Sequence, residues 1–292
     1  MRHDPQNSPE PDKFAAVWIS HSSLSDFLAC PRAYYIANMY KNPRTGRKIT
    51  IVKPPLALGQ VVHSVLDWLS SLPVEQRFSH SLEKKFNELW ITVTGKKGGF
   101  TSQKEENLFH DRGIVMLKRL QENPGPLIRK ALKMKESLPY YWLSQEENII
   151  LCGRIDWIEY LEDTDTVHII DFKTGKREEK ADSLQLPIYY LLAKNCQKRP
   201  VERISYWYID RDNEPKTQNL PNEKEAIDKL MKIALRIKLA RQLNHFKCSV
   251  DQHNGCMHCA PYEAVLKGKG EFVGVGEFNK EVYILSDQSV AL

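Results

Sequence analysis

Two apolar runs that each lead into an aspartate constrain the fold of this chain more than any other feature. Residues 147–161 and 166–173 are rich in β-branched and aromatic side chains, and the polar turn LEDTDT separates them. This pattern predicts two paired β-strands. Asp156 lies within the first run and Asp171 near the end of the second. We therefore expect a sheet that carries carboxylates where its strands end.

The second run closes with Asp171, Phe172 and Lys173. Side chains two residues apart share a face of a strand, so Asp171 and Lys173 point the same way while Phe172 points into the core. If Asp156 lies opposite them on the paired strand, the two carboxylates suit Mg²⁺ or Mn²⁺. The lysine can then orient a water for attack on a phosphate. A surface ion pair is the simpler interpretation of Asp171 and Lys173 taken alone.

Two helical segments carry further candidate residues. In 56–72 the apolar residues repeat at helical spacing, and Gly59 and His63 share a face because they are four residues apart. A lone histidine on a helix is usually structural, although a neutral imidazole can also ligate a metal. Gln185 and Tyr189 are likewise four apart, in a helical pattern after the second strand. By themselves they are ordinary helix residues.

Three cysteines lie close together near the C-terminus: Cys248, Cys256 and Cys259. In a reducing compartment such cysteines are more commonly thiols or metal ligands than disulfides. Three thiolates can hold a metal, and a tetrahedral site needs a fourth ligand. His253 or His258 would complete a zinc site.

Cys30 is an alternative fourth ligand, at the point where Pro31 breaks or restarts an N-terminal helix. A set of four cysteines suits an iron–sulfur centre, which would tie the N-terminal helix to the C-terminus. The remaining cysteines, Cys152 and Cys196, lie at the ends of an apolar strand and an apolar helix and are interpreted as structural.

The order of these residues resembles the RecB-like branch of the PD-(D/E)XK nucleases. The resemblance covers most of residues 20–265 and rests on an N-terminal Cys-Pro-Arg signature, Gly-x-x-x-His, Gly-x-x-Asp, Asp-x-Lys and Gln-x-x-x-Tyr. In this chain the motifs stand at Cys30/Pro31/Arg32, Gly59/His63, Gly153/Asp156, Asp171/Lys173 and Gln185/Tyr189. Each motif is common, but the ordered set is specific.

The resemblance implies a fold and a set of roles. The fold is α/β, a restriction-endonuclease-like mixed sheet flanked by helices. His63, Asp156 and Asp171 would hold Mg²⁺ or Mn²⁺, helped by the carbonyl of Phe172, and Lys173 would act in catalysis together with Asp156 and Asp171. The resemblance gives substrate binding to two further residues, Gln185 and Tyr189.

The implied activity is the hydrolysis of DNA phosphodiester bonds. The resemblance indicates an exonuclease that acts on single-stranded DNA or DNA ends in repair, recombination or CRISPR adaptation. The chain contains no G-x-x-x-x-G-K-[ST] phosphate loop, so it is not itself an ATP-driven helicase. A separate helicase or a CRISPR adaptation protein is therefore an expected partner.

A [4Fe–4S] cluster on four cysteines is also implied by the resemblance, with zinc as the alternative. Its ligands would be Cys30, Cys248, Cys256 and Cys259. The family's usual C-terminal spacing is C-x2-C-x5-C, and this chain departs from it. Val265 stands where the last of those cysteines is expected, and the third C-terminal cysteine lies upstream instead.

The chain is expected to divide into three parts. Residues 1–15 are polar and punctuated by prolines, which is typical of a disordered leader; 16–265 would form the nuclease domain, and 266–292 a tail or hairpin. Helical patterns predict a helical insertion at about 78–138, before the sheet. One of these helical patterns covers residues 126–134.

Further elements follow from local patterns. Ser22 or Ser23 is a plausible N-cap for the first helix, and the sheet is expected to open after residue 140. Alternation predicts a strand at 201–210, and a long amphipathic helix is expected at 222–243.

Composition permits a nucleic-acid partner. The formal net charge is +5, and the loop 41–48 is basic and rich in turn residues, either as a solvated loop or as an edge that contacts phosphates. No apolar segment resembles a signal peptide or a membrane span. We therefore expect a cytoplasmic protein with no membrane association.

Two other classes of function remain open at this stage. The chain could be a DNA-binding module that keeps the fold without cutting, which a gel shift without cleavage would indicate. It could also be a zinc-stabilised scaffold, which would be colourless and contain zinc.

Overall fold

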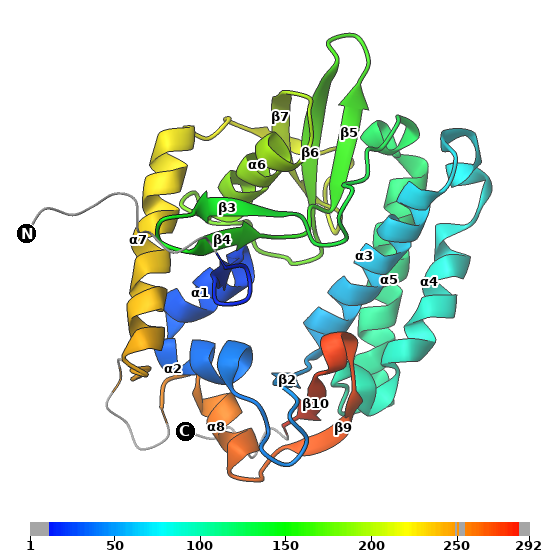
Figure 1. Ribbon diagram of the computed structural model, residues 1–292. Coiled ribbons are helices and arrows are strands. Elements are labelled where there is room, and N and C mark those ends of the chain that lie inside the picture. Colours follow the sequence, from blue (N-terminus) through cyan, green and yellow to red (C-terminus); the bar gives the residue numbers. More distant parts are fainter. Residues whose placement is uncertain (1–11, 249, 251–254, 286–292) are drawn as a thin grey trace, which may run out of the picture.

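Three small sheets and the helices around them make up the computed structural model, which describes residues 12–248, 250 and 255–285 (Figure 1). Most of the predicted leader lies outside the described residues. The first sheet contains, in order, β1 (Val17–Ile19), β4 (Ile149–Cys152) and β3 (Tyr140–Ser144). The second contains β2 (Ile49–Ile51), β10 (Glu281–Ile284) and β9 (Glu271–Val275). The third contains β5 (Trp157–Leu161), β6 (Thr166–Lys173), β7 (Val201–Tyr208) and β8 (Lys216–Gln218).

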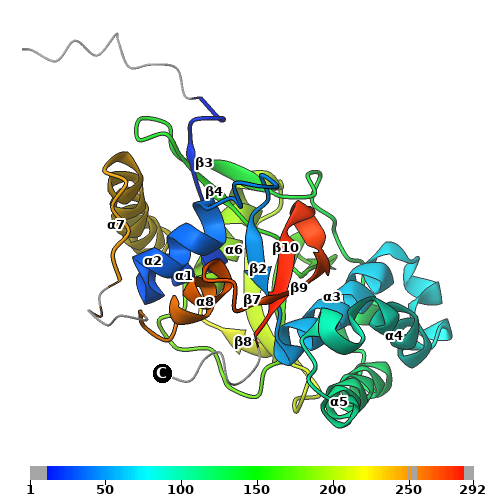
Figure 2. The ribbon, with the colours of Figure 1, turned by 90° about the horizontal axis from the view of Figure 1, so that it is seen from below.

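The helices flank these sheets on both sides (Figures 1 and 2). They are α1 (His21–Ala29), α2 (Pro31–Tyr34), α3 (Pro54–Ser71), α4 (Leu82–Trp90), α5 (Gln103–Glu122), α6 (Gln185–Cys196), α7 (Glu223–Gln242) and α8 (Ala260–Leu266). Short 3₁₀ turns and one π turn connect them: Tyr35–Met39, Val74–Ser79, Ile91–Val93, Gly95–Gly98, Gly125–Ile128 and Glu277–Asn279. In the described residues, no helix combines the length and apolarity needed to cross a membrane. The predicted α/β architecture of mixed sheets flanked by helices is confirmed.

The four-stranded sheet separates two apolar cores. Ile169 of β6 packs into the core with α1, α6 and α7, whereas Ile170 packs into the other core, with α3, α4 and α5. This follows from the alternation of side chains along a strand, since neighbouring residues face opposite sides of the sheet. Both faces of β6 are covered, which accounts for the burial of its six central residues.

Of the predicted first strand, residues 147–161, only the second half pairs with the predicted second strand. β5 and β6 run antiparallel, with Trp157 opposite Ile170, and β6 continues through α6 to the parallel strand β7. The first half of the prediction is wrong, because β4 belongs to the sheet with β1 and β3. The chain leaves β4 at Gly153, where a β-carbon would lie 3.0 Å from Cδ1 of Leu192 in α6. A larger residue would push α6 away from this turn.

The start of the sheet was predicted wrongly. The first strand is β1, well before residue 140, and it pairs in parallel with β4. β1 has only three residues and lies directly before a helix. It is therefore too short to show the alternation of apolar and polar residues that marks a strand. The first helix begins one turn earlier than predicted, because Ser20 is its N-cap and forms a capping box with Ser23.

The segment 126–134 is not a helix. The last turn ends at Ile128, and the next residues lie extended beside the edge of β5, where Leu132 N–H donates to the Ile158 carbonyl at 2.8 Å. The backbone of this segment therefore satisfies an exposed strand edge, and that tertiary contact overrides the helical periodicity. The remaining part of 78–138 contains α4 and α5, and its description as a separate insertion stays a prediction.

A buried polar row crosses the third sheet. Glu159 accepts from His168 at 2.7 Å, and the other ring nitrogen of His168 lies 2.7 Å from the Ser205 hydroxyl. All three side chains are at most 1% exposed, so no substrate reaches Ser205. Arg129 pairs with Glu159 at 2.6 Å. The row satisfies its own buried groups and links β5, β6 and β7.

Packing between α4 and α5 depends on Gly113, where a β-carbon would lie 2.3 Å from Cζ of Phe86. Gly113→Ala is expected to lower the free energy of unfolding by roughly 1–3 kcal/mol, because the buried ring has to move in a filled core. Denaturant titration measures this change. The matched control is Gly175→Ala, which meets no atom within 4 Å and is not at a positive φ. An unfolding midpoint for Gly113→Ala equal to that of the unsubstituted chain would show that the α4–α5 contact is loose.

Candidate active site

The end of β6 carries a buried carboxylate beside a lysine. The side chain of Asp171 is 1% exposed, and its Oδ2 lies 2.9 Å from Nζ of Lys173. The two side chains point to the α6 side of the sheet, while Phe172 points to the opposite core, as predicted. Burial of this pair in a region of low dielectric makes their mutual attraction strong.

Gln185, the first residue of α6, joins these two side chains. Its Nε2 donates to Asp171 Oδ1 at 2.7 Å and to the Tyr189 hydroxyl at 3.2 Å. Its Oε1 accepts a hydrogen bond from Lys173 Nζ. Gln185 and Tyr189 are both buried and lie one helical turn apart. The amide thus restricts the orientation of both the Asp171 carboxyl and the Lys173 ammonium.

Asp156 and His63 complete the group from two other elements. Asp156 lies on the turn before β5, and its Oδ2 accepts from the backbone N–H of Phe172 at 3.0 Å. The same oxygen lies 3.5 Å from Nδ1 of His63 on α3. The structure therefore brings His63, Asp156, Asp171 and Lys173 to one place, although they come from separate parts of the chain.

Gly59 allows α3 to approach this site. A β-carbon at this position would lie 3.3 Å from the Thr174 hydroxyl, directly after β6. This is tighter than an ordinary van der Waals contact, so a larger residue would move α3, and with it His63, outward. The spacing of Gly59 and His63 thus has a direct structural reason.

The charges of the site are strongly coupled. Burial, and then the negative charge of Asp156, raise the pKa of Asp171 to about 7, against the opposing effect of Lys173. Burial lowers the pKa of Lys173, but Asp171 and Glu179 raise it above its ordinary value, so the side chain is an ammonium. For His63, burial lowers the pKa and Asp156 more than reverses this.

Three residues near Lys173 were not predicted from the sequence. Glu179 Oε1 lies 3.1 Å from Nζ, and the Tyr206 ring centroid lies 5.3 Å from it. His21, at the start of α1, lies close enough that burial and then the charge of Lys173 lower its pKa. No motif marks these residues, because each reaches the site through the tertiary fold alone.

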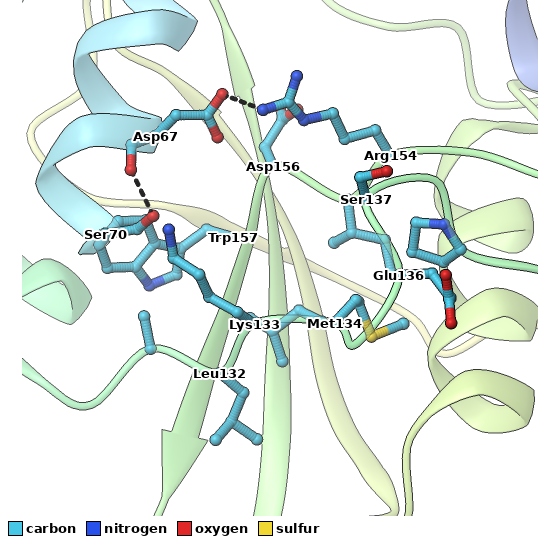
Figure 3. Close-up of a pocket in the computed structure, with 14 residues that line it drawn as sticks. Asp67, Ser70, Leu132, Lys133, Met134, Glu136, Ser137, Arg154, Asp156 and Trp157 are labelled. Carbon is cyan, nitrogen blue, oxygen red and sulfur yellow. Dashed lines mark hydrogen bonds and ion pairs between the residues drawn. The ribbon is translucent and has the colours of Figure 1, made fainter.

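A small cavity of about 150 Å³ adjoins Asp156 (Figure 3). Arg154 and Asp67 form an ion pair at its edge, and Lys133 lines it as well. Figure 3 shows that these side chains come from the turn before β5, from α3 and from the segment beside β5. The cavity therefore brings two cationic groups, Arg154 and Lys133, close to Asp156.

The acidic end of the site fits a hard divalent cation. Asp171 Oδ2 is buried and lies 2.9 Å from the Lys173 ammonium, but it receives no hydrogen bond of good geometry, so it can still act as a ligand. Carboxylate oxygens are the ligands that Mg²⁺ and Mn²⁺ prefer. In the described part of the chain, the ligand atoms of His63, Asp156 and Asp171 do not all approach within 4.8 Å of one another. These side chains would have to close on a bound ion.

A second candidate site is made of four cysteines. The sulfur atoms of Cys30, Cys248, Cys256 and Cys259 all lie within 4.8 Å of one another, and those of the last two are 3.8 Å apart. Cys30 and Cys259 are buried. The four residues named from the sequence are thus brought together, and this set could bind a metal ion or an iron–sulfur cluster. His258 is exposed and outside the set, and His253 lies outside the described residues.

The cysteine cluster ties the two ends of the chain together. Cys30 joins α1 to α2, while Cys259 leads into α8, which lies against these helices (Figures 1 and 2). Arg32 pairs with Glu263 across the same contact at 2.5 Å. Gly255 has a φ of +77°, and a β-carbon there would lie 2.4 Å from the Cys259 sulfur. The loop into the cluster therefore requires glycine.

One thiol of the cluster ionises readily. Burial raises the pKa of Cys256, but hydrogen bonds from the backbone N–H groups of Cys259 and His258 and from neighbouring thiols lower it to about 7. Burial raises the pKa of Cys30 and Cys259. A metal binds the thiolate form of cysteine. The positive charge of a bound metal would therefore stabilise the ionised sulfurs of Cys30 and Cys259, which burial disfavours.

A comparison with protein families gives one result for most of the chain. The model described as "PD-(D/E)XK nuclease superfamily" matches residues 18–264. This range begins in β1 and ends in α8, so it contains both candidate sites. No curated protein sequence matches the chain significantly.

Proposed function

Because this chain belongs to the PD-(D/E)XK nuclease superfamily, we propose that it is a metal-dependent nuclease that hydrolyses DNA phosphodiester bonds. Members of the superfamily are usually nucleases that use Mg²⁺ or Mn²⁺, and the mixed sheets flanked by helices agree with a restriction-endonuclease-like fold. The observation that carries the proposal is the buried pair of Asp171 and Lys173, held by Gln185 beside Asp156. The negative charge of Asp156 raises the pKa of Asp171, and a bound cation would offset this repulsion.

Asp156 and Asp171, with His63, would hold the cation. A bound Mg²⁺ or Mn²⁺ supplies Lewis acidity at the phosphate and lowers the pKa of water. The Phe172 N–H donates to Asp156 and so positions its carboxylate. The carbonyl of Phe172 lies at the same end of β6. The chain thus presents oxygen and imidazole ligands from three elements around the end of β6.

Lys173 would orient the attacking water and stabilise the charge that develops on the phosphate. Its raised pKa keeps it cationic, so it acts as a hydrogen-bond donor. Gln185 and Glu179 restrict the position of Nζ. Hydrolysis adds water across one phosphorus–oxygen bond: the hydroxyl joins phosphorus, and the departing oxygen takes up a proton. Gln185 and Tyr189 would help to hold the substrate strand beside this group.

The finer assignment is to the RecB-like branch, with exonuclease activity on single strands or DNA ends. The motif order supports it, from Cys30 through Gly59 and His63 to Gln185 and Tyr189. A role in repair, recombination or CRISPR adaptation, alongside a separate helicase or adaptation protein, belongs to the same proposal.

The cysteine cluster would hold a [4Fe–4S] cluster or a zinc ion. Four cysteines without a histidine favour iron–sulfur. The 3.8 Å sulfur separation of Cys256 and Cys259 favours zinc, because four thiolates about 2.3 Å from one ion stand about that far apart. Anaerobic purification distinguishes them: an iron–sulfur protein is brown and contains iron, whereas a zinc protein is colourless.

Metal dependence tests the proposed reaction. End-labelled single-stranded DNA is expected to be degraded with Mg²⁺ or Mn²⁺ and to stay intact in excess EDTA, with activity returning when the ion is restored. Gel electrophoresis follows the products and shows from which end they arise. Binding without cleavage under both ions would favour the non-cleaving DNA-binding module instead.

A further inference from the structure

The tip of the β9–β10 hairpin holds an exposed aromatic side chain on a strained backbone. Phe278 has φ 54° and ψ 27°, and Asn279 follows with φ 57°. Both lie in the left-handed region, as in the two-residue turns that favour Asn-Gly. A bulky residue is a rare choice there. The ring is 88% exposed, so packing does not explain it. Strain of this kind commonly marks a functional position.

This tip lies beside the proposed active site. Gln60 of α3 donates to Glu277 at 3.3 Å. Gln60 precedes His63 by three residues, which is about 4.5 Å along the helix axis. Figures 1 and 2 both show the hairpin tip next to the N-terminal half of α3. A strand that reaches His63 along this side of α3 would therefore pass close to the tip.

A cavity of about 580 Å³ lies beneath the hairpin. Phe278 is one of its lining residues, and most of the others are apolar. They include Ile51, Val52, Leu56, Val273, Val275 and Val282. Two lysines, Lys97 and Lys280, the amide of Gln60 and the carboxylate of Glu277 also line it. An apolar cavity with a few polar groups and cationic residues suits a flat aromatic ring that carries hydrogen-bonding edges and a phosphate.

The surroundings of the tip are cationic. Arg47 donates to Asn279 at 2.9 Å, which connects the basic loop 41–48 to the turn. Burial lowers the pKa of Lys48, and the nearby positive charges of Lys280, Arg241 and Lys41 lower it further. Lys280 also lies close enough to Asp26 of α1 to oppose the raised pKa that burial gives this carboxyl. Such a concentration of positive charge attracts a phosphate backbone.

We propose that Phe278 stacks on an unpaired base of the DNA strand that enters the active site, and that the cavity beneath the hairpin receives this base. The inference deepens the proposed nuclease function, on which it rests, by naming the side chain and the cavity that would hold a base next to the reacting phosphate. Every base has an aromatic face, so this contact favours unpaired strands without selecting a sequence.

The same features argue for a base rather than for a protein partner. The hairpin also exposes Phe272 and Val275, but Phe278 is the most exposed of the three and stands on a narrow turn, whereas a protein interface buries a wide apolar surface. Arg47 donates to the next residue, Asn279, and Lys97 and Lys280 line the same cavity as Phe278, so cationic groups are available for the phosphates next to a stacked base.

Substitution of Phe278 tests the proposal. Asparagine fits left-handed backbone better than phenylalanine, so Phe278→Asn is expected to keep or raise the thermal midpoint. It is also expected to weaken binding of fluorescein-labelled oligodeoxythymidine about tenfold, because one stacked base is lost. Fluorescence anisotropy in EDTA measures the affinity without cleavage. Phe278→Trp is expected to bind at least as tightly as the unsubstituted chain.

Oligonucleotides with 2-aminopurine at successive positions locate the stacked base. One position is expected to change its fluorescence with the unsubstituted chain and to lose this change with Phe278→Asn. Phe14→Ala removes another exposed ring, 97% accessible and outside the hairpin, and is the matched control. Equal affinity and equal fluorescence for Phe278→Asn and the unsubstituted chain would overturn the proposal, as would absence of oligonucleotide binding. Cleavage is assayed separately, so a chain that degrades DNA but passes neither test loses only the stacking inference.

Discussion

Asp171→Asn is expected to reduce the rate of Mg²⁺-dependent DNA cleavage at least about 10²–10³-fold while the protein stays folded. The substitution removes a negative charge from the site but keeps an oxygen that can accept from Gln185 Nε2. Because Asp171 is buried beside Asp156, loss of its charge also relieves repulsion. The measurement is single-turnover degradation of end-labelled single strands, with the thermal midpoint recorded alongside. Reduced activity with an unchanged or raised midpoint identifies a catalytic role.

Lys173→Ala extends this test. It is expected to reduce cleavage to a similar degree, and also to lower stability, because it leaves the buried Asp171 carboxylate without its cation. The control is Lys176→Ala, an exposed lysine three residues further along the chain, which is expected to keep full activity. Mg²⁺-dependent cleavage by Lys173→Ala at the rate of the unsubstituted chain would rule out the proposed mechanism.

Cys259→Ser is expected to release the bound metal or cluster and to lower the thermal midpoint by at least about 10 °C. Structural zinc sites stabilise small domains by roughly 10–16 kcal/mol, and loss of one thiolate removes a large part of such a contribution. Cys259 is buried between α8 and the helices around Cys30, so the contact between the chain's two ends would loosen. Metal analysis and absorbance in the visible range, with thermal melting, measure both effects.

The matched control for this substitution is Cys196→Ser. Cys196 lies outside the cluster, and its sulfur donates to the Tyr140 carbonyl at 3.5 Å, a bond that serine can also make. It is expected to keep the metal and the thermal midpoint. A Cys259→Ser protein with full metal content would show that the four sulfurs do not hold the metal. They would then meet only as packed thiols.

Regular periodicity accounts for what was predicted correctly in the fold. β6 and α6 are long enough for alternation and helical spacing to show, and the pairing of β5 with β6 follows from the short turn between them. β1 was missed because three residues carry no period, and 126–134 was misassigned because the edge of β5 offered its backbone better hydrogen bonds than a helix on its own.

Residue types and their order along the chain were enough to name the groups that meet in each candidate site. A histidine, two carboxylates and a lysine, in that order along the chain, indicate the proposed chemistry, because function depends on which donors and acceptors are present. Glu179, the position of Cys30 next to Cys259 and the strained ring of Phe278 beside α3 were decided by the tertiary structure. The physical reason is that distances between remote segments depend on how helices and sheets pack, and no local pattern encodes that packing.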